Sequence, residues 1–350
     1  LCQDDLISSL PLNTEGEVIK LQDRRKKVQS PAEGLDEAVQ ILKQRVADKQ
    51  LRDSIITTMT QQWQMDSSEI DLNLKECKVG DRGAVALAEI LTSECTIRSL
   101  NIFECGITHL GGVEIAKALD TNAHLQTLNL SRNLIGEESG RVLAEALVLN
   151  QSLESLDLSW CQIPEKTAVK LIGALELNSS LKTLELWGNN LGSASAESFL
   201  RTHQKNPQAA RVELSYNILG DSGATFMAEA WKLDLPGNHL YLKENLIGDK
   251  GATALAQSVK DHQTLSLFDL ERNRIGDEGA IAIANMLKVN QSLREVNLRA
   301  NSIGDKGLLA MMEAIEVNTN LKQVVLRGNL ISSEMVDSVK ALKHDIIEVQ

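Results

Sequence analysis

The chain has 350 residues, a formal net charge of −12 and an aromatic content of only 3%. The negative charge argues against general nucleic-acid binding, which needs a basic stripe, so we expect no nucleic-acid partner. No apolar run reaches the length of about 18 residues that a membrane-spanning helix needs, so we expect no membrane partner. The acidic start, Leu1-Cys2-Gln3-Asp4-Asp5, is unlike a secretory signal, and the missing Met indicates a processed chain or a fragment.

The first predicted element is helical. Ser30-Pro31-Ala32-Glu33 is a capping box with proline at the first helical position. Apolar residues then recur at helical spacing as far as Trp63, which predicts a helix, broken at some point, over roughly 31–64. We assign residues 1–66 to an N-terminal extension with a helical cap on the open edge of the following repeats. A partner-binding helix is the alternative role for this segment.

A period of 28 residues then runs from Glu69 to the C-terminus, and we assign residues 67–350 to a repeat domain. Ten copies begin at positions 69, 97, 125, 153, 181, 209, 237, 265, 293 and 321. A fixed period of this kind means that similar units stack along a line and share one continuous core. Positions within a copy are numbered from one to 28 below.

The first half of each copy reads LxxLxLxxN, in which positions four and six alternate as a short strand does. In the copy that begins at 265, these positions are Phe268 and Leu270, and Asn273 occupies position nine. A buried Asn at each step can bond backbone groups of its own turn and of the next one. Cysteine takes this position in three copies (Cys77, Cys105 and Cys161), where a thiol can replace the amide as a weak donor. Such free thiols suit a reducing compartment, and no metal-binding cysteine spacing accompanies them.

The second half reads GxxLAxxL, with apolar residues at helical spacing, and glycine at position twelve is expected to relieve a tight turn. Each copy is therefore predicted to be one strand and one helix. Because helices are wider (about 10 Å) than the spacing of strands (about 4.8 Å), the stack is expected to curve. We predict an α/β horseshoe solenoid with parallel strands on the concave face and helices on the convex face.

This pattern, LxxLxLxx[N/C]x[I/L]GDxGAxxLAxxLxxNxS, resembles the ribonuclease-inhibitor-like class of leucine-rich repeats over about four fifths of the chain. The class includes ribonuclease inhibitor, the repeat regions of NOD-like receptors, the Ran GTPase-activating proteins and several axonemal and cytoskeletal proteins. The resemblance implies the fold strongly and the function weakly, because a fold does not fix a function.

Several copies depart from the pattern, and position one is Glu69, Ala209 or Gly237 in three of them. The copy that begins at 181 has His203 where leucine is expected, and the copy that begins at 209 has Ala209 at position one and Trp231 in place of leucine. Because the strand residues survive in both copies, we interpret the convex helical layer as the weakened part. Either the curvature changes near 200–237 or a partner packs on that outer face.

Side chains at positions three, five, seven and eight are predicted to face the concave side. Five of the ten aromatic residues fall there, and we predict them as partner-binding anchors: Phe103, Trp160, Trp187, Tyr216 and Tyr241. The alternative is that they fill space between loops. Three acids stack at position five and predict a basic partner surface: Asp157, Glu185 and Glu213. Three arginines in the last copies complete the predicted site: Arg272, Arg299 and Arg327. A solvated face of alternating sign is the alternative for these.

No catalytic constellation emerges, because the six histidines are scattered and His239 alone is clearly concave. The sequence therefore predicts a non-enzymatic scaffold or adaptor without cofactor or metal, which holds protein partners on its concave face and N-terminal helix. We expect it in the cytoplasm, as a subunit of a larger assembly such as a cytoskeletal or ciliary (axonemal) complex. The alternatives are a small-GTPase regulator resembling the Ran activators, for which Arg132 is the residue to test, a ligand-sensing fragment of a NOD-like receptor, and an inhibitor that wraps an enzyme.

Overall fold

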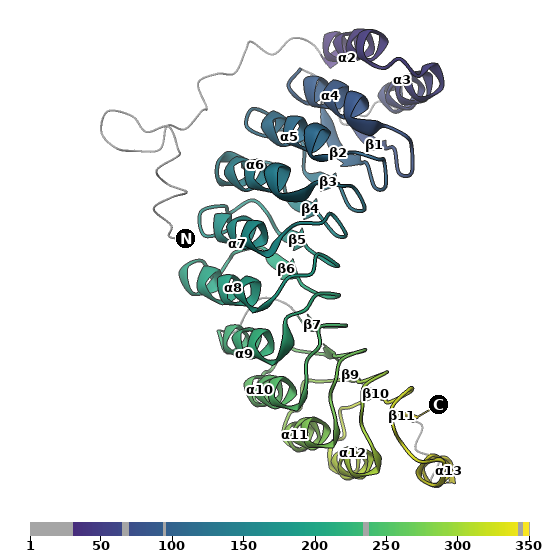
Figure 1. The fold of residues 1–350 in the computed structure, drawn as a ribbon, viewed down its shortest axis with the longest axis vertical. Coiled ribbons are helices and arrows are strands. Elements are labelled where there is room, and N and C mark those ends of the chain that lie inside the picture. The colour runs from purple at the N-terminus through teal and green to yellow at the C-terminus, as the bar shows by residue number, and fades with distance from the viewer. Residues whose placement is uncertain (1–30, 65–69, 94–95, 234–237, 342–345, 350) are drawn as a thin grey trace, which may run out of the picture. The chain divides into compact units, whose positions relative to one another are not determined.

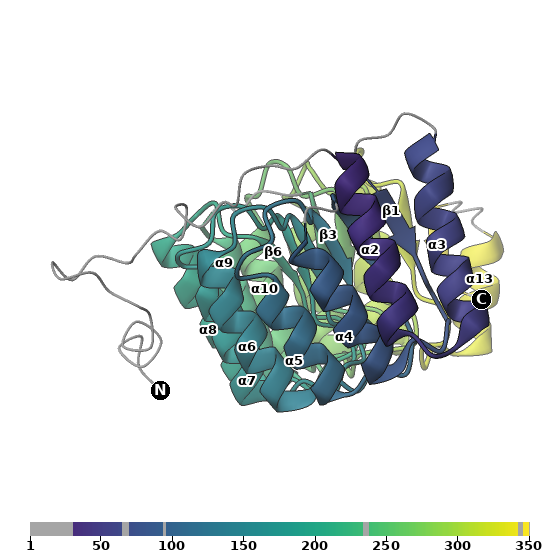
Figure 2. The same cartoon turned by 90° about the horizontal axis from the view of Figure 1, so that it is seen from above.

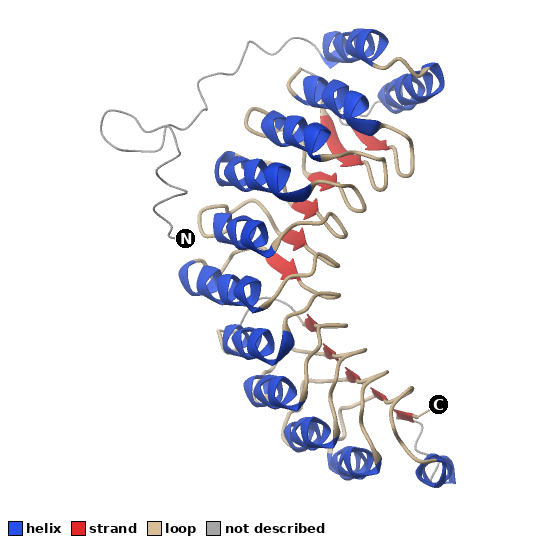
Figure 3. Ribbon diagram, in the orientation of Figure 1, coloured by secondary structure: helices blue, strands red, loops and turns tan. Residues whose placement is uncertain are grey.

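The computed structural model describes residues 31–64, 70–93, 96–233, 238–341 and 346–349. The chain divides into two compact units, which are described separately (Figure 1). The first unit spans residues 1–161 and 177–182, and the second spans 162–176 and 183–350. From residue 70 onward, strands alternate with helices along the chain, and in each unit these helices lie on one side of the strands (Figure 3).

Among the described residues, two helices precede the first strand, as the sequence predicts. They are α2 (Pro31–Arg45) and α3 (Lys49–Gln64). Helix α2 packs against α4 (Gly80–Leu91), and α3 packs against β1 (Ile70–Asn73), which are the helix and strand of the first copy. Apolar residues such as Leu42 and Met59 are fully buried there, and Arg45 forms an ion pair with Glu89 at 2.7 Å. These contacts fit the cap that the sequence predicts.

The first unit continues with one strand and one helix for each copy. Its remaining elements are β2 (Ile97–Asn101), α5 (His109–Ala118), β3 (Thr127–Asn129), α6 (Gly136–Leu149) and β4 (Ser155–Asp157). Neighbouring strands are parallel and pair residues 28 apart, so that Leu100 lies opposite Leu128 and Leu128 opposite Leu156. Helices α4, α5 and α6 run side by side, as the view from above shows (Figure 2).

The second unit begins with a helix and repeats the same order. Its helices are α7 (Glu165–Ala174), α8 (Ser193–Lys205), α9 (Gly220–Trp231), α10 (Asp249–Val259), α11 (Asp277–Leu287), α12 (Asp305–Val317) and α13 (Ser333–Ala341). Its strands are β5 (Thr183–Glu185), β6 (Arg211–Glu213), β7 (His239–Tyr241), β8 (Leu267–Asp269), β9 (Glu295–Asn297), β10 (Gln323–Val325) and β11 (Ile347–Glu348).

The strands of the second unit form two parallel ladders instead of one. Strand β5 pairs with β6, and β7 to β11 pair in order, but β6 and β7 belong to different sheets. The turns that follow these two strands still meet, because the Tyr216 N–H donates to the Lys243 carbonyl at 2.7 Å. Helices α8 and α9 are both formed and pack together. The irregular copies therefore interrupt the sheet and not, as the sequence suggested, the helical layer.

The asparagine ladder at position nine is confirmed. The Asn301 side chain donates to the carbonyl of Leu270, in the preceding copy, at 2.9 Å and to that of Leu298 at 3.0 Å, and it accepts from the Ile275 N–H at 3.1 Å. Cysteine also acts as expected at this position, because the Cys161 thiol donates to the Leu130 carbonyl at 3.1 Å. Burial raises the pKa of Cys161 to about 12, so this thiol stays protonated and structural.

A second asparagine ladder lies at position 26, in the loop that follows each helix. The Asn290 amide donates to the Val259 carbonyl at 2.8 Å, and its oxygen accepts from the Leu293 N–H at 2.8 Å. The same arrangement recurs at other copies, with the amide donors Asn122, Asn150, Asn178, Asn206 and Asn318. In these copies the loop between the helix and the next strand is thus tied to the preceding copy through an amide side chain.

A third ladder uses the carboxylate at position thirteen. The Asp249 carboxylate, at the start of α10, accepts from the N–H groups of Gly276 at 2.7 Å and Gly279 at 2.8 Å, at the start of α11. Each such acid therefore caps the helix of the next copy: Asp81, Glu165, Asp221, Asp277 and Asp305 do the same. This bond also explains why position twelve differs between copies. The glycine is left-handed, with φ of 66° at Gly136 and 59° at Gly220, where the preceding copy has no acid at position thirteen.

We expect Asp249→Ala to lower the free energy of unfolding by about 1–2 kcal/mol, because two charge-assisted bonds to a helix N-terminus are lost. Asp249→Asn should lose less, since it keeps an acceptor oxygen. The matched control is Glu278→Ala, an exposed acid in the first turn of α11 that should cost a few tenths of a kcal/mol. Urea denaturation of the three variants measures the difference, and equal losses for Asp249→Ala and Glu278→Ala would refute the capping role.

Candidate functional site

The turn after each strand holds position eight in a left-handed backbone. The φ angles are 56° at Arg132, 57° at Trp160, 58° at Tyr216 and 55° at Arg272, and nearly every copy shares this geometry. A left-handed conformation costs an ordinary residue of the order of 1 kcal/mol of conformational free energy. The fold therefore holds these side chains at the edge of the strands despite local backbone strain. Sequence spacing alone does not reveal this strain, although glycine at two of these positions, Gly188 and Gly328, is a sign of it.

The first unit carries a cluster of alternating cations and rings, here called the first aromatic cluster. It consists of Lys75, Phe103, Arg132 and Trp160. The Lys75 ammonium lies 4.9 Å from the Phe103 ring centre, and the Arg132 guanidinium lies 5.9 Å from Phe103 and 5.8 Å from Trp160. Trp160 is 46% exposed, so this ring is available to a partner. The cations hold the rings in place through cation–π attraction.

The second unit carries the second aromatic cluster, which consists of Trp187, Tyr216 and Lys243. The Trp187 and Tyr216 rings stack with centres 6.2 Å apart, and the Lys243 ammonium lies 5.4 Å from the Tyr216 ring centre. Lys243 also forms an ion pair at 3.0 Å with Glu271, which is buried. Burial opposes ionisation of Glu271, but hydrogen bonds from Lys243 and Asn297 keep its pKa below the ordinary value. Lys243 thus links the Tyr216 ring to a buried network formed with Glu271 and Asn297.

One of the three acids of position five is buried. Asp157 lies in the first unit, where its carboxylate accepts from the Ser159 N–H at 2.9 Å. Glu185 and Glu213 lie in the second unit on β5 and β6. Glu213 is only 7% exposed and forms an ion pair with Arg211 of its own strand. The carboxylate of Glu213, which the sequence predicts to attract a basic partner, is therefore paired with an arginine of the same chain.

The three arginines of the predicted site are exposed, and each pairs with an acid. Arg272 lies 3.3 Å from Glu244, Arg299 lies 3.7 Å from Glu271, and Arg327 lies 3.0 Å from Glu348. Ion pairs at the surface contribute roughly 0–1 kcal/mol, so these bonds are easily exchanged for others. The arrangement fits the face of alternating sign that the sequence left open as an alternative.

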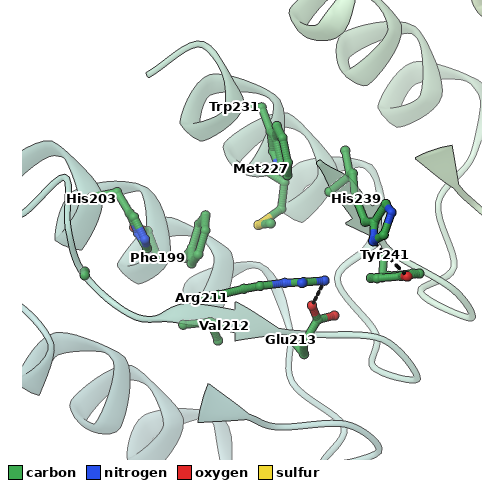
Figure 4. Close-up of a pocket in the computed structure, with 11 residues that line it drawn as sticks. Phe199, His203, Arg211, Val212, Glu213, Met227, Trp231, His239 and Tyr241 are labelled. Atoms are coloured by element: carbon green, nitrogen blue, oxygen red, sulfur yellow. Dashed lines mark hydrogen bonds and ion pairs between the residues drawn. The ribbon is translucent and has the colours of Figure 1, made fainter. Parts of the chain in front are cut away.

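Tyr241, the fifth predicted aromatic residue, belongs to a pocket between β6, β7, α8 and α9 (Figure 4). The pocket has a volume of about 40 Å³. Its lining residues are Phe199, His203, Ala209, Arg211, Val212, Glu213, Met227, Trp231, His239, Leu240 and Tyr241. Most of its inner wall is apolar, and the polar side chains of β6 and β7 stand at the strand side.

The copies that contain β6 and β7 both lack the leucine of position one, which is Ala209 in the first and Gly237 in the second. Position one is a fully buried leucine in copies such as those of Leu153 and Leu265, but it is Ala209 here. Solvent reaches this layer as a result. Val212 and Leu240, at position four of β6 and β7, are 6% and 3% exposed, whereas position four is 0% exposed in the other strands from β2 to β10. The sequence shows Ala209 as a departure from the pattern and predicts a weakened helical layer. The structure instead shows the change between strands β6 and β7.

Charged groups line the strand side of the pocket. The Arg211 guanidinium reaches the Glu213 carboxylate and lies 5.3 Å from the Tyr241 ring centre, across the interruption of the sheet (Figure 4). Burial raises the pKa of Glu213 to about 7, with Arg211 opposing this shift and Glu185 adding to it. Burial also raises the pKa of Tyr241 and lowers that of His203, whose ring stacks on Phe199. Burial is the largest cause of all three of these pKa shifts.

No group of three or more His, Cys, Asp or Glu side chains in the described part of the chain is placed to hold a metal ion. Among the described helices, none combines the length and the apolar content needed to cross a membrane. The aromatic clusters and the pocket remain as the candidate binding features among the described residues.

Comparison with known proteins identifies the repeat. A family model described as a leucine-rich repeat matches residues 71–88, 121–144, 149–163, 238–256, 261–284 and 289–312. The matched segments leave out 164–237, which contains the irregular copies. The crystal structure of an internalin from Listeria monocytogenes str. 4b F2365 aligns with a TM-score of 0.51 and 16% identity over 88% of this chain and 96% of that chain. At this identity the likeness concerns the fold alone. No curated protein matches the sequence in a comparable search.

These matches agree with the observed order of elements, in which every 28-residue copy contributes one parallel strand and one helix. The chain therefore contains leucine-rich repeats, which stack as a solenoid of parallel strands and helices.

Proposed function

We propose that the chain is a non-enzymatic scaffold that binds a protein partner on its strand face, through the first and second aromatic clusters. Leucine-rich repeats generally mediate protein–protein interaction, and this property is the starting point of the proposal. A full helix in each 28-residue copy supports the ribonuclease-inhibitor-like subclass.

The observation that carries the proposal is the ordering of three large rings, of which Trp160 is exposed and Trp187 and Tyr216 are half-buried. Trp160, Trp187 and Tyr216 are each held by a cation or by a second ring, as the distances above show. Tryptophan, tyrosine and arginine dominate the binding energy of protein interfaces. Side chains that are already ordered lose little conformational entropy on binding, so a partner gains more from each contact.

The proposal includes a place in a larger cytoplasmic assembly, such as a cytoskeletal or axonemal complex. Two buried cysteines support the cytoplasm. Cys105 and Cys161 are buried free thiols that serve as hydrogen-bond donors in the position-nine ladder. A reducing compartment preserves such thiols.

The test is a pulldown from native extract with identification of the bound proteins. Two double variants, Phe103→Ala with Trp160→Ala and Trp187→Ala with Tyr216→Ala, remove one cluster each. We expect a dominant partner to be lost or weakened at least about tenfold by one of them, since each pair removes about 1.4 kcal/mol or more of binding energy. Phe226→Ala, a partly buried ring on α9, is the matched control. An unchanged list of partners for both double variants, with intact circular dichroism, would refute the proposal.

A further inference from the structure

We infer that the pocket between β6 and β7 accepts one aliphatic side chain of the protein partner, with Arg211 as a lid that moves aside. This inference rests on the proposed function, because it places a protein partner on the strand face. It adds a specific receptor site and the chemistry of the residue that enters it.

The chemistry of the occupant follows from how the pocket arises. The repeat pattern places a leucine at position one, and Ala209 removes most of that side chain. The walls that would have contacted it remain in place: Phe199 and Met227 on the helices and Val212 and Leu240 on the strands. A void with apolar walls loses dispersion contacts and gains them back from a group of matching shape. A leucine-like side chain from outside is therefore the complementary guest.

The entrance lies at the interruption of the sheet. Elsewhere in the described sheets, neighbouring strands are joined by hydrogen bonds, which leave no gap between the strands for a side chain to reach the core. Strands β6 and β7 lack this ladder over their described residues, although their following turns meet at the bond between Tyr216 and Lys243. The small exposure of Val212 and Leu240 marks the same route.

Arg211 covers this entrance. Its side chain is 40% exposed and extends across the pocket from β6, and only its guanidinium end is held, by Glu213 and by the Tyr241 ring of β7 (Figure 4). An arginine side chain has several low-energy rotamers, so it can swing to solvent without moving the backbone. The groups that then line the rim, Glu213, His239 and Tyr241, offer hydrogen bonds to the peptide groups that flank the entering side chain.

The experiment uses the full chain labelled with 13C in the methionine methyl groups, and it observes Met227 by nuclear magnetic resonance. Met227 lines the pocket, its signal is assigned with Met227→Leu, and the other methionines serve as internal references. The probe is N-acetyl-leucine methylamide, compared with the alanine and arginine analogues. We expect the leucine probe to shift the Met227 signal alone and in a saturable manner.

Three variants decide the assignment. Arg211→Ala combined with Glu213→Gln removes the lid without leaving a buried charge. This variant should bind the leucine probe roughly tenfold more tightly, because its pocket is open in all molecules, whereas Arg211 closes it in most molecules of the natural chain. Ala209→Leu fills the pocket and should abolish the shift. Leu235→Ala, at a leucine that follows α9 in the sequence and lies outside the described residues, tests occupation by the chain itself and should leave the shift unchanged.

Several results would overturn the inference. These are the absence of a Met227 shift in the lid-free variant, an undiminished shift in Ala209→Leu, a stronger response to the arginine probe than to the leucine probe, or a stronger response in Leu235→Ala. The two proposals fail separately. The probe needs no partner, and the variants of the pulldown lie outside the pocket, so loss of the probe effect would leave the aromatic clusters untouched.

Discussion

Asn273→Ala is expected to lower the free energy of unfolding by about 3 kcal/mol, one of the largest effects of a single substitution in this chain. The Asn273 amide donates to the carbonyls of Leu242 at 2.9 Å and Leu270 at 3.0 Å, and its oxygen accepts from the N–H groups of Asn245 at 2.9 Å and Ile247 at 3.0 Å. Alanine leaves these buried backbone groups without partners. Each such group costs about 1–3 kcal/mol, and partial rearrangement recovers some of the sum.

Asn285→Ala is the matched control, because Asn285 belongs to the same copy but is exposed on α11. Alanine has the higher helix propensity, so this variant should be neutral or slightly more stable. Urea denaturation monitored by circular dichroism measures both variants. A loss below about 1 kcal/mol for Asn273→Ala would show that the ladder is dispensable and that the leucine layers alone hold neighbouring copies together.

The ladder of position nine could be predicted because a period of 28 places equivalent residues side by side. A polar residue that recurs between buried leucines can only be satisfied by the backbone of its own turn or of a neighbouring copy, which is what Asn301 shows. The ladder of position thirteen could not be predicted in this way. Asp249 looks like an ordinary acid in the first turn of its own helix, whereas its bonds go to the helix of the next copy. The spacing of the repeat shows which residues of adjacent copies are neighbours, but it does not show in which direction a side chain points.

The candidate site was predicted to a similar extent. Spacing placed Trp160, Trp187 and Tyr216 on the strand face, but it gave neither the left-handed turns nor the cations that hold the rings. It also treated Glu213 as exposed, because position five alternates with buried leucines. The interruption between β6 and β7 changes the surroundings of that carboxylate. Such a defect depends on how several bulky side chains pack at once, which no periodic pattern encodes.

The buried carboxyl group of Glu213 should make stability depend on pH in an unusual direction. Burial, with a smaller contribution from Glu185, raises its pKa from an ordinary value of 4.5 to about 7, although Arg211 opposes the shift. The folded chain then holds a proton between these two pH values that the unfolded chain has released. The free energy of unfolding that this group contributes is therefore complete below pH 4.5 and falls by about 3 kcal/mol as the pH rises to about 7.

The difference in stability between the natural chain and Glu213→Gln isolates this effect, because Asp269, Glu271 and His203 titrate in both proteins. Glutamine mimics the protonated acid, so the two proteins should be similarly stable near pH 4.5. The variant should then be more stable by about 3 kcal/mol near pH 7.5, and the difference should change little above that. Glu278→Gln, an exposed acid, should follow the natural chain at every pH. Urea denaturation between pH 4.5 and 8 provides the measurement. A constant difference across this range would mean that the ion pair with Arg211 fully offsets the burial of Glu213.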